Sequence, residues 1–303
     1  MHLIVNTFNT SSNLPLFAAM ASGSFARRGL TIEVQGTPNS DEQRAGLAAG
    51  RFAIAHAAVD NAVAMVEAGH DVAIVCGGDA GMNDLMVRPE INGFDDLRGK
   101  YLAVDAPNTA YALVGKKILK LHGLLEGRDY QVKLAGGTGP RAAAMVADPQ
   151  LAVGMVNPPF SFTVRNQGLK SLGSQFDLLG PYQATGAFVL QSWARDNGPA
   201  LVNYLAAYIE GQRRVLNPAH RGEMLQLLMQ HFKQTEAVAQ ASYDALVTPG
   251  SGLAVDARFN PEGFATVLAI RAEMEGMWGG QPPAAAKYLN LQFFDQALRA
   301  LPT

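Results

Sequence analysis

The sequence predicts an α/β fold made of two similar lobes, each a mixed, mostly parallel sheet flanked by helices, with a helical C-terminal tail. In the first 76 residues, four strand-like apolar runs alternate with three helical patterns. From about residue 100 the same alternation begins again, and after Trp193 the pattern is almost wholly helical. Strands and helices that alternate at this spacing form mostly parallel sheets with helices on both faces.

The first lobe is predicted from strands that each lead through a loop into a helix. Residues 2–6 form the first strand, and the polar loop 7–13 precedes a helix that Pro15 opens and Gly29 ends. Ser40-Asp41-Glu42-Gln43 matches a capping box, so Ser40 should cap the next helix. The other expected elements are strands 30–35, 51–57 and 71–76, with helices 40–50 and 60–68.

The second lobe repeats this order. Residues 101–104 are a strand, which the loop 105–109 joins to a helix over 110–122. The further elements expected here are strands 130–134, 151–156 and 169–172, and helices 141–147 and 157–165. A strand over 187–190 could return to the first sheet. The helical tail, with segments 199–216, 221–232, 235–246 and 261–278, should pack on one of the lobes.

These patterns divide the chain into two domains. Residues 1–87 and 187–303 are predicted to form the first lobe, and residues 88–186 an inserted second lobe. The chain would then cross between the lobes near 84–92 and again near 183–188, and two crossings make a hinge. A cleft between lobes is where a small ligand is expected, close to the free N–H groups of helix N-termini.

Composition excludes several classes of function. The net charge is −2 and the cations occur at most in pairs, which gives no footprint for nucleic acid or an anionic membrane. No run of 18 apolar residues is present, so no membrane span is expected. The single cysteine, Cys76, can form no internal disulfide and is expected to be a buried, inert thiol. The six histidines show no metal-ligand spacing, and no cofactor or metal is implied.

Three segments resemble a known family: PLFAAMASGSFARRGLTIEV at 15–34, LAAGRFAIA at 47–55 and GFDDLRGKYLAV at 93–104. They are similar to the solute-binding proteins of nitrate, sulfonate and taurine ABC importers, a group that includes relatives of the thiamine-pyrimidine synthases. The resemblance covers roughly residues 4–220, and its sharpest part is DLRGK at 96–100. It implies a type II periplasmic-binding-protein fold whose lobes close over a small ligand. The cysteine-rich motif of the synthases is missing, which argues against pyrimidine synthesis.

The resemblance also implies ligand contacts in the loops that follow the strands of both lobes. In the first lobe the expected residues are Asn9, Thr10, Ser11, Ser12, Asn13, His56, Ala57, Ala58 and Asp60. In the second lobe they are Asn108, Thr109, Thr138, Arg141, Asn157 and Phe160. Ser11, Ser12, Asn13 and Thr109 also stand at predicted helix N-termini, where free N–H groups attract polar or anionic groups.

Each of these residues also has a purely structural interpretation. Ser12, Asn13 and Thr109 can be simple N-caps, and Asp60 can cap its own helix. His56 can be a satisfied core histidine. Arg141 can be a solvated helix arginine instead of an anion-binding one. Aromatic residues such as Phe160 can belong to the core.

The sequence therefore predicts a non-catalytic solute-binding component of an ABC importer. Its ligand would be a small polar organic molecule, with an anionic group expected, and its partner an ABC permease; a monomer is the expectation. No secretory signal precedes the first strand, so the protein would be periplasmic with its signal removed, or else cytoplasmic. The alternative is a cytoplasmic decarboxylase or isomerase on the same fold, with His56, Asp60 and Asp79 as acid–base candidates. A regulatory ligand-sensing domain would need a DNA-binding segment, which this sequence does not contain.

Overall fold

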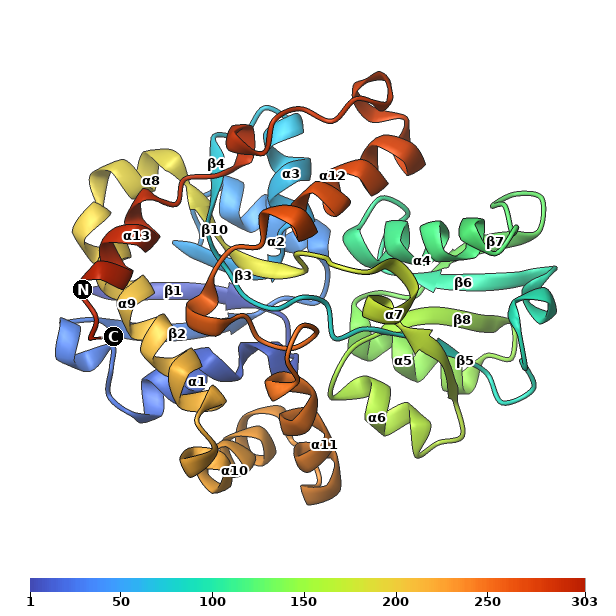
Figure 1. Cartoon of the computed structure of the whole chain (residues 1–303), viewed down its shortest axis with the longest axis horizontal. Helices are drawn as coiled ribbons and strands as arrows, with labels where there is room; N and C mark the ends of the chain where they lie inside the picture. Colours follow the sequence, from blue (N-terminus) through green and yellow to red (C-terminus); the bar gives the residue numbers. More distant parts are fainter. Residues whose placement is uncertain (303) are drawn as a thin grey trace.

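The computed structural model describes residues 1–302 and contains two five-stranded mixed sheets (Figure 1). The first sheet has the strand order β2-β1-β3-β10-β4 and the second the order β7-β6-β8-β5-β9. The strands of the first sheet are β1 (His2–Thr7), β2 (Thr31–Gly36), β3 (Ile54–Ala58), β4 (Val72–Gly77) and β10 (Thr185–Leu190). Those of the second are β5 (Asp84–Val87), β6 (Lys100–Val104), β7 (Tyr130–Leu134), β8 (Leu151–Val156) and β9 (Lys170–Ser174). The predicted α/β class is confirmed.

Helices flank both sheets because their apolar faces pack on the buried strands. The helices that follow strands of the first sheet are α1 (Leu14–Ala21), α2 (Ser40–Ala48) and α3 (Asp60–Glu67). Those within the second part of the chain are α4 (Ala110–Leu121), α5 (Thr138–Ala147), α6 (Phe160–Arg165) and α7 (Gln175–Leu179). The C-terminal part adds α8 (Gln191–Asp196), α9 (Gly198–Leu216), α10 (Arg221–Phe232), α11 (Glu236–Val247), α12 (Pro261–Glu275) and α13 (Gln292–Arg299). Short 3₁₀ turns lie at η1 (Ser11–Asn13), η2 (Ala26–Arg28), η3 (Phe94–Leu97), η4 (Pro218–His220), η5 (Val255–Ala257), η6 (Met277–Gly280) and η7 (Ala285–Tyr288).

One strand in each sheet runs against its neighbours. β10 lies antiparallel between β3 and β4, and β5 lies antiparallel between β8 and β9. The predicted division at residue 87 assigns residues 84–87 to the first lobe, whereas their hydrogen bonds are to β8 and β9 of the second sheet. The first crossing therefore precedes Asp84, and we propose a boundary near residue 83.

The structure corrects several predicted helices. The first helix ends at Ala21 instead of reaching Arg28, because Gly23 adopts φ +73° and breaks it. The cap of α2 is Asn39, whose Oδ1 accepts from the Glu42 N–H at 2.8 Å, so the helix is capped one residue earlier than predicted. Helices α7, α8 and α13 were not predicted. Helices α7 and α8, with five and six residues, are too short to set up a clear helical period, whereas α13 is as long as the predicted α1.

The helical tail contacts both lobes, which corrects the expectation that it packs on one. Helix α9 packs on α1, where Gly211 lets the two backbones approach: a Cβ there would overlap the Pro15 carbonyl oxygen. Helix α12 instead reaches across to α4 (Figure 1), and Glu273 on α12 pairs with Lys117 at 2.7 Å and Lys120 at 2.9 Å. The tail thus helps to set the position of one lobe against the other.

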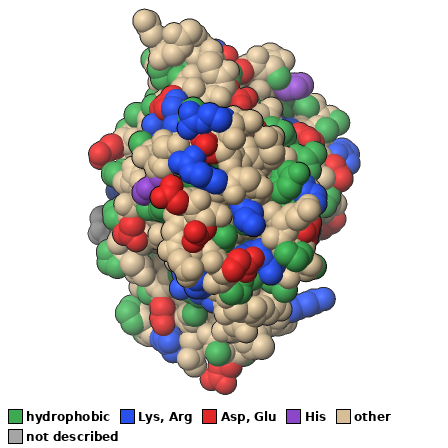
Figure 2. All heavy atoms as spheres, turned by 90° about the vertical axis from the view of Figure 1, so that its right-hand side faces the viewer, with side chains coloured by type: hydrophobic (Ala, Val, Ile, Leu, Met, Phe, Trp, Pro, Cys, Tyr) green, Lys and Arg blue, Asp and Glu red, His purple; other side chains and the backbone are tan. Residues whose placement is uncertain are grey.

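Charged side chains are mixed on the surface of the second lobe. Figure 2 shows the end of the molecule that this lobe forms, with basic and acidic groups interspersed on it. Neither sign gathers into a continuous patch on that face, which agrees with the small net charge of −2.

Candidate functional site

A polar cavity lies between the two sheets, at the edge where the parallel strands end. Its volume is about 60 Å³. A cavity of this size has room for several waters. The lining residues are Phe8, Thr10, Ser12, Asn13, Ser40, His56, Ala57, Ala58, Asn61, Asp105, Thr109, Ala110, Tyr111, Gly137, Thr138, Arg141, Asn157, Thr185 and Tyr208. The carboxyl ends of parallel strands are where ligands bind in α/β sheets.

Ten of the fifteen predicted binding residues line this cavity. They are Thr10, Ser12, Asn13, His56, Ala57, Ala58, Thr109, Thr138, Arg141 and Asn157. They come from both lobes, over a span of almost 150 positions, and the fold brings them to one place. Their contact with a ligand stays a prediction.

The loop after β1 forms one wall and is held by its own side chains. The hydroxyls of Thr10 and Ser12 lie 3.0 Å apart. Asn13 Nδ2 donates to the Phe8 carbonyl oxygen at 2.8 Å and to Thr10 Oγ1 at 3.3 Å. Asn13 precedes α1 as its N-cap residue but makes no side-chain capping bond. These bonds fix the loop and leave its polar atoms directed at the cavity.

His56 contributes a neutral imidazole to the cavity wall. Burial lowers the pKa of His56 to about 3, so the ring is uncharged at neutral pH. Its Nε2 lies 2.7 Å from the hydroxyl of Tyr204, and its ring packs against Tyr208 with 4.7 Å between ring centroids. The residue therefore offers hydrogen bonding and shape without charge.

Arg141 places a buried cation in the opposite wall. Only 2% of the residue is exposed, which excludes the solvated helix arginine considered from the sequence. Its guanidinium donates to the carbonyl oxygens of Met155 and Gly136 and to Thr138 Oγ1. Burial lowers the pKa of Arg141 to about 10, against the opposing effect of the Asp105 carboxylate. The side chain thus remains charged at neutral pH.

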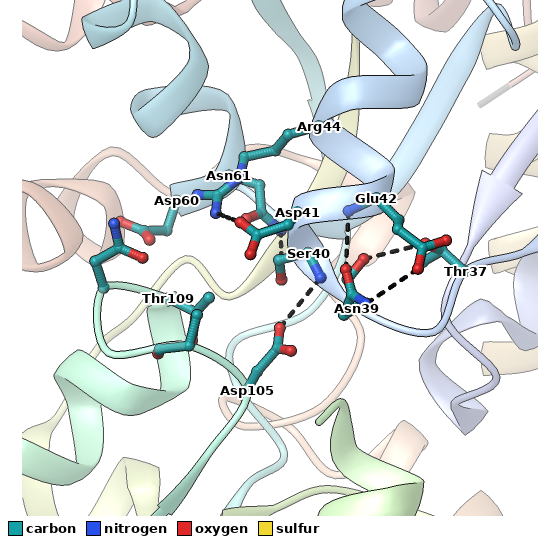
Figure 3. Close-up of polar contacts among 12 residues, drawn as sticks. Thr37, Asn39, Ser40, Asp41, Glu42, Arg44, Asp60, Asn61, Asp105 and Thr109 are labelled. Atoms are coloured by element: carbon teal, nitrogen blue, oxygen red, sulfur yellow. Dashed lines mark hydrogen bonds and ion pairs between the residues drawn. The ribbon is translucent and has the colours of Figure 1, made fainter. Parts of the chain in front are cut away.

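Asp105 extends from the loop after β6 toward the first lobe. Its Oδ2 accepts a hydrogen bond from the Ser40 N–H at the start of α2, at 3.2 Å (Figure 3). A carboxylate at a helix N-terminus interacts favourably with the free N–H groups and the helix dipole. Asn61 lies on the same side of the cavity, with Nδ2 3.5 Å from Ser40 Oγ. The bond between Ser40 and Asp105 joins the two lobes directly beside the cavity.

Further contacts bring the lobes together around the cavity. The Ser11 N–H donates to the Pro158 carbonyl oxygen at 3.2 Å, and Arg271 Nη2 donates to the Asn108 carbonyl oxygen at 3.0 Å. A Cβ on Gly137 would lie 2.7 Å from the Pro38 carbonyl oxygen, so only glycine allows this approach of the two backbones. Together with the Asp105–Ser40 bond, these contacts describe a closed arrangement of the lobes.

Five predicted binding residues lie outside the cavity lining. Asn9 is exposed, and Ser11 Oγ accepts from Gln234 Nε2 at 2.9 Å. The ring of Phe160 packs against Gly139. Asn108 accepts a hydrogen bond from Arg271 through its backbone carbonyl oxygen. The fifth residue is Asp60, which is buried in an ion pair with Arg271.

Asp60 forms a buried ion pair instead of facing the cavity. Arg271 Nε lies 2.8 Å from Asp60 Oδ1, and Arg271 Nη2 lies 2.6 Å from Oδ2. Burial lowers the pKa of Arg271, but the Asp60 carboxylate outweighs this effect and the pKa is raised. With both carboxylate oxygens engaged, Asp60 is held by the C-terminal tail, and the capping role considered for it is not seen.

Asp79 likewise lies beside the cavity without lining it. The Thr185 hydroxyl donates to its carboxylate, which also accepts from the Gly81 N–H at 2.8 Å. Burial raises the pKa of Asp79, and the Thr185 hydrogen bond partly opposes that effect. Nowhere in residues 1–302 do three or more His, Cys, Asp or Glu side chains converge in a manner suited to a metal ion.

Nine lining residues were not predicted from the sequence. They are Phe8, Ser40, Asn61, Asp105, Ala110, Tyr111, Gly137, Thr185 and Tyr208. Asp105 directly follows a predicted strand, so its position was a usable signal. Tyr208 lies in the middle of α9 and reaches the cavity only through tertiary packing.

Solved structures with the same fold include several ligand-binding proteins. The chain aligns with a ligand-binding component of an ABC-type import system from Staphylococcus aureus, with a TM-score of 0.82 and 13% identity over 98% of this chain and 99% of that one. It aligns with the periplasmic nitrate-binding protein NrtA of Synechocystis PCC 6803 at TM-score 0.80 and 16% identity, covering 99% and 89%. The chain also aligns with the alkanesulfonate-binding protein SsuA of Xanthomonas axonopodis pv. citri, bound to MOPS. The TM-score is 0.73 and the identity 16%, over 98% of this chain and 97% of that one. These likenesses confirm the predicted two-lobed fold.

Sequence comparison adds the family. No curated protein sequence matches the chain. No helix in residues 1–302 has both the length and the apolar character needed to span a bilayer. Residues 2–229, about three quarters of the chain, match the model of the NMT1-like family. The chain belongs to the NMT1-like family.

Proposed function

We propose that the chain is the solute-binding component of an ABC importer, which captures a small polar molecule between its two lobes. The observation that carries this proposal is the cavity, which both lobes line at the C-terminal ends of their parallel strands. The two chain crossings on either side of the inserted segment provide a hinge for opening and closing. A periplasmic location and delivery to an ABC permease are parts of the same proposal.

The geometry suits binding better than catalysis. The three acid–base candidates do not converge on the cavity: Asp60 is paired with Arg271, and Asp79 is not among the lining residues. His56 does line it, but burial holds the pKa of its imidazole near 3. A general base works best when its pKa lies near the operating pH. We therefore do not propose the decarboxylase or isomerase.

A calorimetric and thermal-shift screen tests the proposal. The panel should contain alkyl sulfonates, nitrate, carboxylates, amino acids, aminopyrimidines and polyamines. A ligand present at a hundred times its dissociation constant adds about 2.7 kcal/mol to the free energy of unfolding. For 303 residues the unfolding entropy is about 0.64 kcal/mol/K, so the melting temperature should rise by about 4 °C.

The same screen separates binding from turnover. A ligand that is recovered chemically unchanged after release supports the importer component. A compound that is chemically converted contradicts the importer component and supports an enzyme on the same fold. Absence of any shift across all the classes would count against small-molecule capture in this cavity.

A further inference from the structure

The cavity lining carries one positive and one negative side chain. Arg141 is the only Lys or Arg among the lining residues of the described chain, and Asp105 is the only Asp or Glu. His56 also lines the cavity, but its imidazole is uncharged at neutral pH. Tyr111 and Tyr208 remain neutral phenols because burial raises the pKa of each. The site is therefore balanced in charge, although a site for simple anions needs only the cation.

Arg141 is ready to receive an anionic group. A guanidinium has five N–H donors, and four of those of Arg141 are used on Met155, Gly136 and Thr138. The four bonds go to three neutral oxygen atoms, and within residues 1–302 Arg141 makes no salt bridge to a carboxylate. A buried guanidinium that makes no direct ion pair favours a carboxylate or sulfonate beside it.

Asp105 favours a hydrogen-bond donor or a cationic group on the ligand. Its Oδ2 is held by the Ser40 N–H, whereas its Oδ1 accepts no hydrogen bond from the described residues. An ionised carboxylate can only accept hydrogen bonds, so its free oxygen requires an N–H or O–H donor or a cation. A simple anion beside Arg141 would meet repulsion from this carboxylate, whose charge already acts on Arg141.

Two buried amides provide further hydrogen bonds without choosing a charge. Asn61 and Asn157 are 3% and 7% exposed, and the side-chain oxygen of each has no hydrogen-bond partner. Both residues line the cavity. A buried polar atom without a partner is costly, so these amides also indicate a hydrogen-bonding ligand. Arg141 and Asp105 are therefore the residues that select the ligand by its charge.

We infer that the site binds small zwitterions, with the anionic group beside Arg141 and the amino group at Asp105. This inference rests on the proposed function and narrows its ligand class. Asp105 is then the residue that determines specificity, because it makes an amino group favourable and a bare anion unfavourable. The small volume of the cavity in this closed arrangement favours a ligand the size of a short amino acid over a bulky one.

The test compares molecules that differ by one charged group. β-Alanine carries both groups, propionate lacks the amine, propylamine lacks the carboxylate, and nitrate is a simple anion. Isothermal titration calorimetry at low salt should give wild-type protein at least a tenfold preference for β-alanine over each of the other three. A preference for propionate or nitrate would overturn the inference while leaving the proposed function intact.

Asp105→Asn tests the role of that residue. The asparagine side chain keeps an oxygen that can accept from the Ser40 N–H, so the contact between the lobes is retained while the charge is lost. We expect the preference for β-alanine over propionate to fall below threefold and propionate to bind more tightly than to wild type. The matched control is Asp95→Asn, which removes an exposed carboxylate from the same lobe and should leave the preference unchanged.

Every other outcome is decisive. An unchanged preference in Asp105→Asn would show that Asp105 does not set specificity and would overturn the inference. If none of the four probes binds at 20 mM, the zwitterion class is wrong. In that case, a ligand of another class found in the wider screen would still support the proposed function, whereas no ligand at all would refute both.

Discussion

Replacing Arg271 by methionine is expected to destabilise the protein strongly, because the Asp60 carboxylate would remain buried without its counterion. The two side chains are 4% and 3% exposed, and two hydrogen bonds of 2.8 and 2.6 Å join them. Removal of one partner of a buried ion pair costs about 3–5 kcal/mol. Arg271 also donates to the Asn108 carbonyl oxygen, so the substitution removes a contact between the lobes as well.

The expected change in melting temperature follows from the size of the chain. Unfolding of 303 residues, at roughly 2.1 cal/mol/K per residue, has an entropy of about 0.64 kcal/mol/K. A loss of about 3–5 kcal/mol therefore lowers the melting temperature by about 5–8 °C. Differential scanning calorimetry of wild type and Arg271→Met measures this directly, and urea unfolding gives the free energy independently.

A double variant separates the orphaned charge from lost packing. Asp60→Asn combined with Arg271→Met removes both charges, so it should be more stable than Arg271→Met alone. Arg195→Met serves as the control, since Arg195 pairs with Asp71 at 3.5 Å on the exposed surface and should change stability by less than about 1 kcal/mol. The reasoning is refuted if Arg271→Met melts within 2 °C of wild type, or if the double variant is the least stable of the set.

Two further predictions concern the core and the response to pH. Gly211→Ala should lower the free energy of unfolding by about 1–3 kcal/mol, because its Cβ would overlap the Pro15 carbonyl oxygen. Gly222→Ala, at an open position of α10, is the control and should be stabilising by about 0.5–1 kcal/mol. Urea unfolding measures both variants. A comparable loss of unfolding free energy at both sites would contradict the close approach of α1 and α9. Burial lowers the pKa of His56 to about 3, so below about pH 6.5 the unfolded state binds a proton that the folded state does not. His56 should therefore make stability fall by about 1.4 kcal/mol per pH unit from pH 6 to pH 4, and urea unfolding of His56→Gln should show a shallower slope by that amount. Equal slopes would mean that His56 is protonated in the folded state.

Much of the fold was predictable because its elements carry local signals. The strands of the first sheet are short apolar runs, and glycines with positive φ, such as Gly29 at +69°, end the preceding turns. The first helix was predicted too long because the apolar pattern continues past Gly23, whose left-handed backbone breaks it. Helices as short as α7 and α8 hold too few residues for a period to be recognised.

The candidate site was predictable only where it follows the strand ends. Residues at or just after the end of a predicted strand, such as His56 and Asn157, line the cavity. Asp60 was chosen on the same grounds, but its partner Arg271 lies 211 positions later, and no local pattern could pair them. Tyr208 was missed because its place in the wall depends on how α9 packs across the first sheet. Local sequence thus predicts which loops meet, and the long-range contacts decide which side chains remain free.

The place of β10 in the first sheet has a consequence for the order of events during synthesis. Strand β4 is buried along its whole length, and β10 is the only strand with which it pairs. About 108 residues separate the end of β4 at Gly77 from the start of β10 at Thr185, and they include the whole second sheet. Contacts between residues so far apart in sequence form slowly. A nascent chain that stops before Thr185 therefore exposes an unpaired apolar strand edge, which favours aggregation until the inserted lobe and β10 have been synthesised.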